Sequence, residues 1–275
     1  MPATHQKCRS PRVPTRCAAQ LMSESRFRPE HARRFAEAGL VVVPKLASAQ
    51  RVRELREVAQ THLAAAVAPL EYEADLRYPG APPARNAPGG ATVRRLLQAY
   101  ARDSVFRDWA TGPEVAEPLH HILGPRVMLS QVHHNCVMTK QSRYSSETGW
   151  HQDIRYWSFE RPELVSLWLA LGREFPENGG LSFLPRSHTM EFAGDRLDDA
   201  LFLHTGNPLN QALIDTRLTP LLEPGDAVFF HCRTQHSAGS NSTAETKLSL
   251  VFSYHAADNQ PLPGTRSASL PSVTV

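Results

Sequence analysis

The first half of the chain carries apolar residues at helical spacing. Val52, Leu55 and Leu63 would share one face of a long helix, and Ser48 is suited to cap its first turn. The same pattern predicts four helices, at about 31–38, 48–68, 92–102 and 113–123. Between the first two helices, the β-branched run 40–43 is closed by Pro44 and predicts a short strand.

The second half changes, after Gly124, to apolar runs of strand length. Turn-forming residues separate these runs and predict strands at 127–138, 164–171, 180–185, 227–231 and 247–255. Helices followed by many short strands predict one mainly β domain, a closed or double-sheet jelly roll with N-terminal buttressing helices. We expect the less regular stretch 186–219 to be an insertion over the mouth of the barrel.

The two ends of the chain differ from this central domain. Residues 1–22 contain three prolines, four basic residues and no acidic residue, and they lack hydrophobic periodicity. We interpret them as a disordered extension or as sequence upstream of a true start at Met22, with an organelle transit peptide as the alternative. The expected organisation is this extension, one domain at 23–262 and a C-terminal tail at 263–275.

Length, charge and cysteine content narrow the class of protein. The 275 residues, 41% of them apolar, suffice for one sizeable core, and no apolar run approaches the roughly 20 residues that cross a bilayer. Residues 1–22 contribute four positive charges to the net charge of +3, so the rest of the chain has a net charge of −1. We therefore expect neither a nucleic-acid nor a membrane partner. Four cysteines without a CxxC pair favour a reducing, cytoplasmic location.

The segment 149–157 carries the most informative polar residues. On a strand, His151 and Asp153 would point to the same side while Gln152 points away. One imidazole and one carboxylate at this spacing can bind a metal together. A third ligand, a late histidine, would complete the 2-His-1-carboxylate triad of non-haem Fe(II) oxygenases. His236 is favoured over His231 because it follows strand 227–231 by a short connection and precedes a turn rich in Ser, Gly and Asn.

A His-x-Asp pair alone is a weak signal in a chain with 13 histidines, but its context is specific. The chain has WHQD at 150–153, SLWLAL at 166–171 and ENGGLSFLPRSH at 177–188, and a late Gly-Asp strand leads to His236. In these segments, and over most of residues 27–256, it resembles the phytanoyl-CoA dioxygenase family.

This resemblance implies a double-stranded β-helix (jelly roll, cupin-like) that binds Fe(II) and uses 2-oxoglutarate and O₂. The expected activity is hydroxylation of an unactivated C–H bond with release of succinate and CO₂, and ascorbate is the expected reductant in vitro. Related halogenases have a small residue in place of Asp153, so its carboxylate favours hydroxylation, although desaturation or ring closure also fit.

The far carboxylate of 2-oxoglutarate needs a cation, which the family usually supplies as an arginine about eleven residues after the distal histidine. This chain has Lys247 there, a departure that replaces a bidentate fork with a point charge. Ser249 would share its strand face, and Leu248 and Leu250 would pack on the other face. Lys140 is a second candidate for the same carboxylate.

The remaining assignments concern the substrate and the orientation of the ligands. We expect Arg155, Tyr156 and Trp157 to line a pocket for a small or medium organic molecule. Three other side chains are candidates to orient the metal ligands: Trp150, Gln152 and Asn241. The neighbouring His133 and His134 show no recognisable ligand spacing.

Oligomeric state and two rival functions complete the expectations. We expect a monomer or a weak homodimer. One rival is a cupin-like metal-dependent oxygenase that does not use 2-oxoglutarate, which Lys247 in place of arginine keeps open. The other is a non-catalytic binding module on the same barrel, which the complete triad disfavours because unpaired buried ligands are costly.

Overall fold

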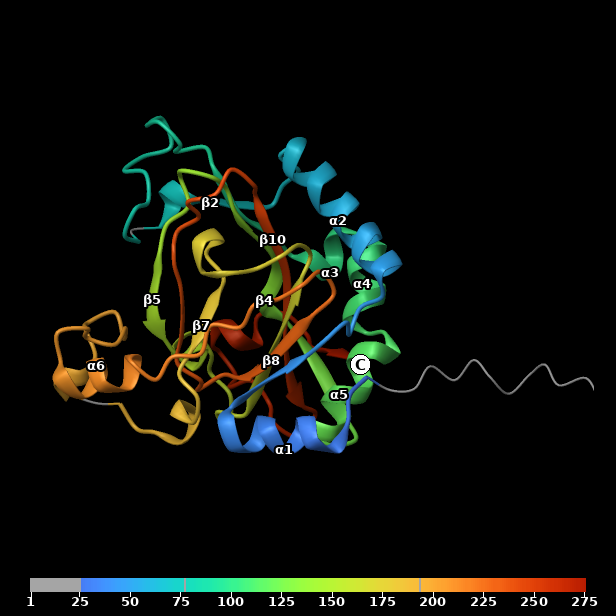
Figure 1. Cartoon of the computed structure of the whole chain (residues 1–275). Coiled ribbons are helices and arrows are strands. Elements are labelled where there is room, and N and C mark those ends of the chain that lie inside the picture. Colours follow the sequence, from blue (N-terminus) through green and yellow to red (C-terminus); the bar gives the residue numbers. More distant parts are fainter. Residues whose placement is uncertain (1–25, 77, 193) are drawn as a thin grey trace, which may run out of the picture.

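A computed structural model of the chain describes residues 26–275 apart from residues 77 and 193 (Figure 1). The extension predicted at residues 1–22 lies outside the described residues. None of the helices in the described part has the length and apolar character needed to span a membrane.

Two antiparallel sheets form the body of the protein and confirm the mainly β jelly roll. In the described part, eight strands make the larger sheet, in the order β1-β8-β6-β10-β4-β3-β2 with β11 paired to β4. These are β1 (Leu40–Val43), β2 (Leu70–Tyr72), β3 (Val93–Leu97), β4 (Val127–Lys140), β6 (Leu164–Ala170), β8 (Ala227–His231), β10 (Lys247–Ala256) and β11 (Val273–Thr274). The smaller sheet has the order β5-β9-β7, with β5 (Thr148–His151), β9 (His236–Ala238) and β7 (Leu181–Phe183).

Strand alternation gives the larger sheet two different faces. On β10, Leu248 and Leu250 belong to the core between the sheet and the helices, whereas Val251 belongs to the core between the two sheets. On β6, Leu167 likewise belongs to the core on the helix side and Trp168 to the core between the sheets. Every residue of that strand is buried. The sequence therefore directs one face to the helical layer and leaves the opposite face to line the barrel.

Five helices cover the outer face of the larger sheet, on the right and at the bottom of Figure 1. They are α1 (Pro29–Ala38), α2 (Ala49–Ala64), α3 (Ala99–Arg102), α4 (Ser104–Ala110) and α5 (Pro113–Leu123). The Ser48 hydroxyl accepts a hydrogen bond from the Arg51 amide at 3.1 Å and caps α2 as predicted. The N-terminal buttress is therefore present.

The prediction of a helix at 92–102 is wrong for the first half of that segment. Residues Val93–Leu97 form β3, which pairs with β2 and β4, and short helices follow it. Val93 and Leu96 are buried in the helix-side core, so sheet pairing decides the conformation of a segment whose local preference is helical. Helix α2 also ends at Ala64 rather than near residue 68.

Two segments outside the regular strands pack on the barrel. The C-terminal segment 263–275 contains η6 (Arg266–Ala268) and β11, and the amide of Val275 donates to the carbonyl of Val127 at 3.0 Å. The stretch 186–219 contains η4 (Ser187–Thr189), η5 (Gly194–Arg196) and α6 (Pro208–Ile214) and lies beside β5 and β7, at the left of Figure 1.

Candidate metal centre

The three predicted ligands meet at the smaller sheet. His151 ends β5, His236 begins β9, and the two residues are directly paired across these strands. Asp153 begins the 3-10 turn η2 (Asp153–Tyr156) just beyond β5. One ligand atom of each side chain lies within 4.8 Å of the other two, and all three residues are buried.

The expectation that Asp153 lies on a strand is wrong in detail. Strand β5 ends at His151, but Gln152 keeps an extended backbone, with φ −106° and ψ 136°. The alternation of an extended chain therefore continues for one more residue and brings Asp153 to the side of His151. The side chain of Gln152 points away from the two ligands, and its Nε2 donates to the backbone carbonyl of Arg233 at 2.5 Å.

Hydrogen bonds orient both imidazoles in the same way. Nδ1 of His151 lies 2.9 Å from the carbonyl oxygen of Gly149, and Nδ1 of His236 lies 3.0 Å from that of Thr234. Nδ1 must carry the proton to donate in these bonds, so each Nε2 keeps a free lone pair. Burial lowers the pKa of His151 to about 3, and His236 adds to this shift, so the neutral form that binds metals prevails.

Asp153 presents one oxygen that the protein leaves unsatisfied. Its Oδ1 is buried and has no hydrogen-bond partner among the described residues, but it lies 3.8 Å from Nε2 of His151 and 3.6 Å from Nε2 of His236. Such an orphaned carboxylate oxygen is costly unless a cation satisfies it. Two imidazole nitrogens and one carboxylate oxygen are the donors of the iron facial triad, so these residues fit an Fe(II) ion.

His231, the alternative third ligand, lies apart from this group. Its ring is 5.5 Å from that of His188 and 6.4 Å from that of Phe35, between α1 and the barrel. Its Nδ1 accepts a hydrogen bond from the amide of Arg233 at 3.1 Å. The structure therefore brings His236, and not His231, to His151 and Asp153.

His134 contacts the centre, although its sequence spacing gave no indication of this. It lies on β4 with Nδ1 3.5 Å from Oδ2 of Asp153, and the Ser166 hydroxyl donates to the same oxygen at 3.1 Å. Burial alone would raise the pKa of Asp153, but the surrounding imidazoles and the Ser166 hydroxyl lower it below its usual value. Strand pairing between β4 and β10, and between β10 and β6, creates this contact, which local spacing cannot reveal.

A small cavity of about 50 Å³ extends from the two histidines into the barrel, and both lysines predicted for the cosubstrate line it. Lys140 and Lys247 are paired residues on β4 and β10. Lys247 is buried with Ser249, whose hydroxyl lies 3.1 Å from its ammonium. An acidic residue that sequence reasoning missed, Glu174, forms a buried ion pair with Lys247 at 3.2 Å.

Comparison with known proteins decides the family. A family model described as phytanoyl-CoA dioxygenase (PhyH) matches residues 35–249. The chain belongs to the phytanoyl-CoA dioxygenase family. The resemblance noted in the sequence is thereby confirmed.

Curated relatives of this family member are distant and chemically varied. It is 26% identical to a probable alpha-ketoglutarate-dependent hypophosphite dioxygenase of Stutzerimonas stutzeri, over 62% of this chain and 60% of the relative. It is also 26% identical to an ectoine dioxygenase of Streptomyces anulatus, over 61% of each chain. An L-proline trans-4-hydroxylase of Streptomyces griseoviridis is 26% identical over 67% of this chain and 75% of the relative. The match thus spans about three fifths of the first two relatives' length.

Solved structures of similar proteins carry the same fold. The epimerase SnoN, in complex with Fe³⁺, alpha-ketoglutarate and nogalamycin RO, has a TM-score of 0.68 and 26% identity over 88% of this chain and 89% of its own. EctD from S. alaskensis, with 2-oxoglutarate and 5-hydroxyectoine, has a TM-score of 0.68 and 20% identity over 89% of this chain and 81% of its own. The double-stranded β-helix predicted for this PhyH-family chain is therefore confirmed.

A larger cavity of about 400 Å³ adjoins the metal centre of this PhyH-family chain. His134 and Arg95 line both cavities, and Tyr156 and Trp157 line only the larger one. Trp157 is buried against His133, with ring centroids 5.2 Å apart, so it combines packing with a lining position. Two of the three residues predicted for the substrate pocket therefore face a cavity beside the triad.

Arg155, the third of these residues, does not line that cavity. Its guanidinium lies 4.1 Å from the ring centre of Phe202 and 4.8 Å from that of Tyr156. Phe202 belongs to the stretch 186–219, and its ring lies 5.7 Å from that of His151. The predicted insertion thus reaches one of the three ligands, His151, through the ring of Phe202.

The other predicted orienting residues have different roles. Trp150 belongs to a separate apolar cluster with Leu184 and Leu203, and its backbone carbonyl accepts from the Leu203 amide. The Asn241 side chain donates to the carbonyls of Lys140 and Glu245. These contacts hold the chain around the site, and the backbone carbonyls of residues 149 and 234 orient the imidazoles instead.

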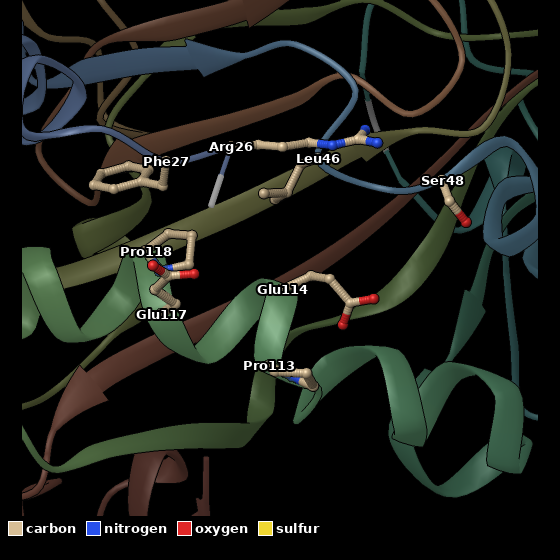
Figure 2. A pocket seen from close by; sticks show the side chains of 8 residues that line it. All are labelled: Arg26, Phe27, Leu46, Ser48, Pro113, Glu114, Glu117 and Pro118. Carbon is tan, nitrogen blue, oxygen red and sulfur yellow. The ribbon is translucent and has the colours of Figure 1, made fainter. Parts of the chain in front are cut away.

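A separate hollow of about 280 Å³ lies on the helical side of the molecule (Figure 2). Figure 2 shows Glu114 and Glu117 of α5 facing it, together with Leu46 and Ser48 from the segment that leads into α2. It shares no lining residue with the two cavities at the metal centre.

Proposed function

We propose that the chain is an Fe(II)- and 2-oxoglutarate-dependent dioxygenase that hydroxylates an unactivated C–H bond of a small or medium organic molecule. One observation carries the proposal: His151, Asp153 and His236 present two free imidazole nitrogens and one unpaired carboxylate oxygen to a common point. Membership of the phytanoyl-CoA dioxygenase family and the iron and 2-oxoglutarate complexes of similar proteins support it.

His151, Asp153 and His236 would hold the metal, and a centre with this donor set would leave positions open for O₂ and the keto acid. When bound, iron and 2-oxoglutarate supply the oxidising chemistry, with succinate and CO₂ as by-products. The protein's part is to hold neutral imidazoles and an ionised carboxylate in place. The carbonyls of Gly149 and Thr234 do so for the imidazoles, and Ser166 and His134 do so for Asp153.

The two adjoining cavities give the reactants separate places. The small cavity is lined by basic side chains and suits an anionic keto acid. The larger cavity has the size of a small-molecule site and suits the substrate. Because His134 lies between the two and contacts Asp153, a substrate in the larger cavity would lie beside the metal.

Succinate formation tests this proposal. Purified protein with Fe(II), ascorbate and 2-oxoglutarate should release succinate, and a metabolite library should reveal the substrate as the compound that accelerates release. Asp153→Ala should abolish the reaction because it removes a metal ligand. His231→Ala removes a histidine outside the triad and should keep most of it. Near-normal succinate release by Asp153→Ala would contradict the ligand assignment.

Two further expectations stay predictions. Monomer or weak homodimer is the oligomeric state that we propose, and light scattering of the purified protein would test it. A reducing, cytoplasmic location is consistent with the free, buried Cys136 and Cys232.

A further inference from the structure

The larger cavity beside the metal centre is bounded on one side by a bulge in β4. Phe252 of β10 pairs with Asn135, and the next residue, Ser253, pairs with Ser130, so residues 131–134 have no partner on β10. All four of these residues line the cavity. A bulge of this kind redirects side chains out of the regular ladder. The wall of the cavity is therefore built by a local departure from strand pairing.

Two neighbouring histidines of this bulge contact different parts of the molecule. Nδ1 of His134 lies 3.5 Å from Oδ2 of Asp153, at the metal centre. Nε2 of His133 lies 2.8 Å from the hydroxyl oxygen of Ser267, in the C-terminal segment. Because both histidines line the larger cavity, this cavity extends from the metal centre to the C-terminal segment.

The C-terminal segment is fixed to the barrel at this point. Ser267 is only 3% exposed, and its hydroxyl accepts a hydrogen bond from the amide of Ser158 at 2.8 Å. A few residues later, β11 pairs with β4. These contacts place Arg266 and Leu270 in the lining of the cavity. The segment expected to be a tail therefore forms a wall of this cavity, although it lies beyond residues 35–249, which the family model matches.

Two arginines line the cavity, and one of them has an acidic partner. Nε of Arg95 lies 3.3 Å from Oε1 of Glu71, which is the only acid among the described residues that line the cavity. Nε of Arg94, which lines the small cavity instead, lies 3.6 Å from the same oxygen. Glu71 is therefore already committed to two guanidinium groups.

The second arginine, Arg266, has no such partner. Its guanidinium forms neither an ion pair nor a hydrogen bond with any residue in the described part of the chain, and it is exposed, so a ligand can reach it. Burial lowers the pKa of His133 to about 3, and the charges of His134 and Arg266 add to this effect, so the imidazole of His133 is neutral. The positive charge of Arg266 thus acts within the cavity and is not balanced there.

We propose that Arg266 binds an anionic group of the substrate, so that the substrate of this chain is a small organic acid. The inference rests on the proposed function. The carboxylate would lie at the Arg266 end of the cavity, since a guanidinium binds a carboxylate through two parallel hydrogen bonds. The carbon skeleton would pack on Trp157, which is buried and lines the cavity, and reach His134 beside the metal centre. Arg266 is thereby a specificity-determining residue that lies outside the segment shared with the family.

Calorimetric titration with two matched probes tests the proposal. The anaerobic Mn(II)-loaded protein is first saturated with 2-oxoglutarate and then titrated with benzoate or with benzamide, which has the same ring but no charge. Benzoate should bind at least about 10-fold more tightly, the lower range for a hydrogen bond to a charged group. Arg266→Met should remove this preference and leave the affinities for benzamide and 2-oxoglutarate unchanged. The unchanged binding of 2-oxoglutarate shows in the same sample that the variant is folded.

The matched control is Arg126→Met. It removes another exposed arginine that forms no ion pair with a described residue, but Arg126 lines none of the three cavities described above. It should keep the affinity for benzoate within about twofold, because salt screens exposed charges at a distance.

Three outcomes overturn the proposal: benzoate fails to bind, benzoate binds no more tightly than benzamide, or the two variants bind benzoate equally well. In each of these cases the metal centre and its cosubstrate stand, because 2-oxoglutarate has bound in the first step. If the Mn(II)-loaded protein does not bind 2-oxoglutarate in that step, the proposed function itself fails.

Discussion

The buried pair of Glu174 and Lys247 makes a strong prediction about stability. Glu174→Gln keeps the size of the side chain and can still accept a hydrogen bond, but it leaves the Lys247 ammonium without a negative charge. Breaking one side of a buried ion pair costs about 3–5 kcal/mol, and the side chains here are only 2% and 1% exposed, so little screening by water applies. We expect a loss of about 3 kcal/mol, the low end, because Ser249 and the Trp168 ring still contact the ammonium.

Thermal unfolding converts this free energy into a measurable shift. A chain of this size has an unfolding entropy near 0.5 kcal/mol/K, so about 3 kcal/mol lowers Tm by about 6 °C. The control is Glu223→Gln, which removes the acid of an exposed pair with Arg173, 3.2 Å away, whose side chains are 61% and 70% exposed. It should cost less than about 1 kcal/mol. Equal, small shifts for both variants would refute the assignment of Glu174 as the counter-ion of Lys247.

Three other predictions follow from the same contacts. Ser166→Ala should lower Fe(II) affinity about 10- to 100-fold, measured by equilibrium titration, because it removes a hydrogen bond to Asp153; an unchanged affinity would argue against this role. Affinity for 2-oxoglutarate should be greatest below about pH 7 and fall as pH rises, because burial lowers the pKa of Lys140, which lines the keto-acid cavity, to about 7 and binding must restore its proton. Calorimetry of Lys140→Met should show no such slope. Leu250→Ala should destabilise the fold by about 2–5 kcal/mol in urea unfolding, because Leu250 is fully buried in the helix-side core.

The sequence predicted most of the fold because its periodicities are strong. The runs at β6, β8 and β10 and the capped helix α2 were recognisable locally. The segment 92–102 was not, because β3 forms only through pairing with β2 and β4, two strands that are separated by more than 50 residues.

In the candidate site, too, some residues could be recognised from local sequence and others are brought together only by the fold. His151 and Asp153 were found because they are two residues apart, and His236 because a strand and turn lead to it. His134 and Glu174 were missed because only strand pairing and a loop bring them to Asp153 and Lys247. The buried acidic partner of Lys247 depends on contacts in space, and no spacing along the chain encodes it.

The most direct test of the central claim is anaerobic addition of 2-oxoglutarate to the Fe(II)-loaded protein, followed by visible absorption spectroscopy. If His151, Asp153 and His236 hold the iron and leave adjacent positions open, a metal-to-ligand charge-transfer band will appear with the keto acid and will be absent in His236→Ala. An iron-loaded protein that binds 2-oxoglutarate without such a band, or a band that survives in His236→Ala, would contradict the account.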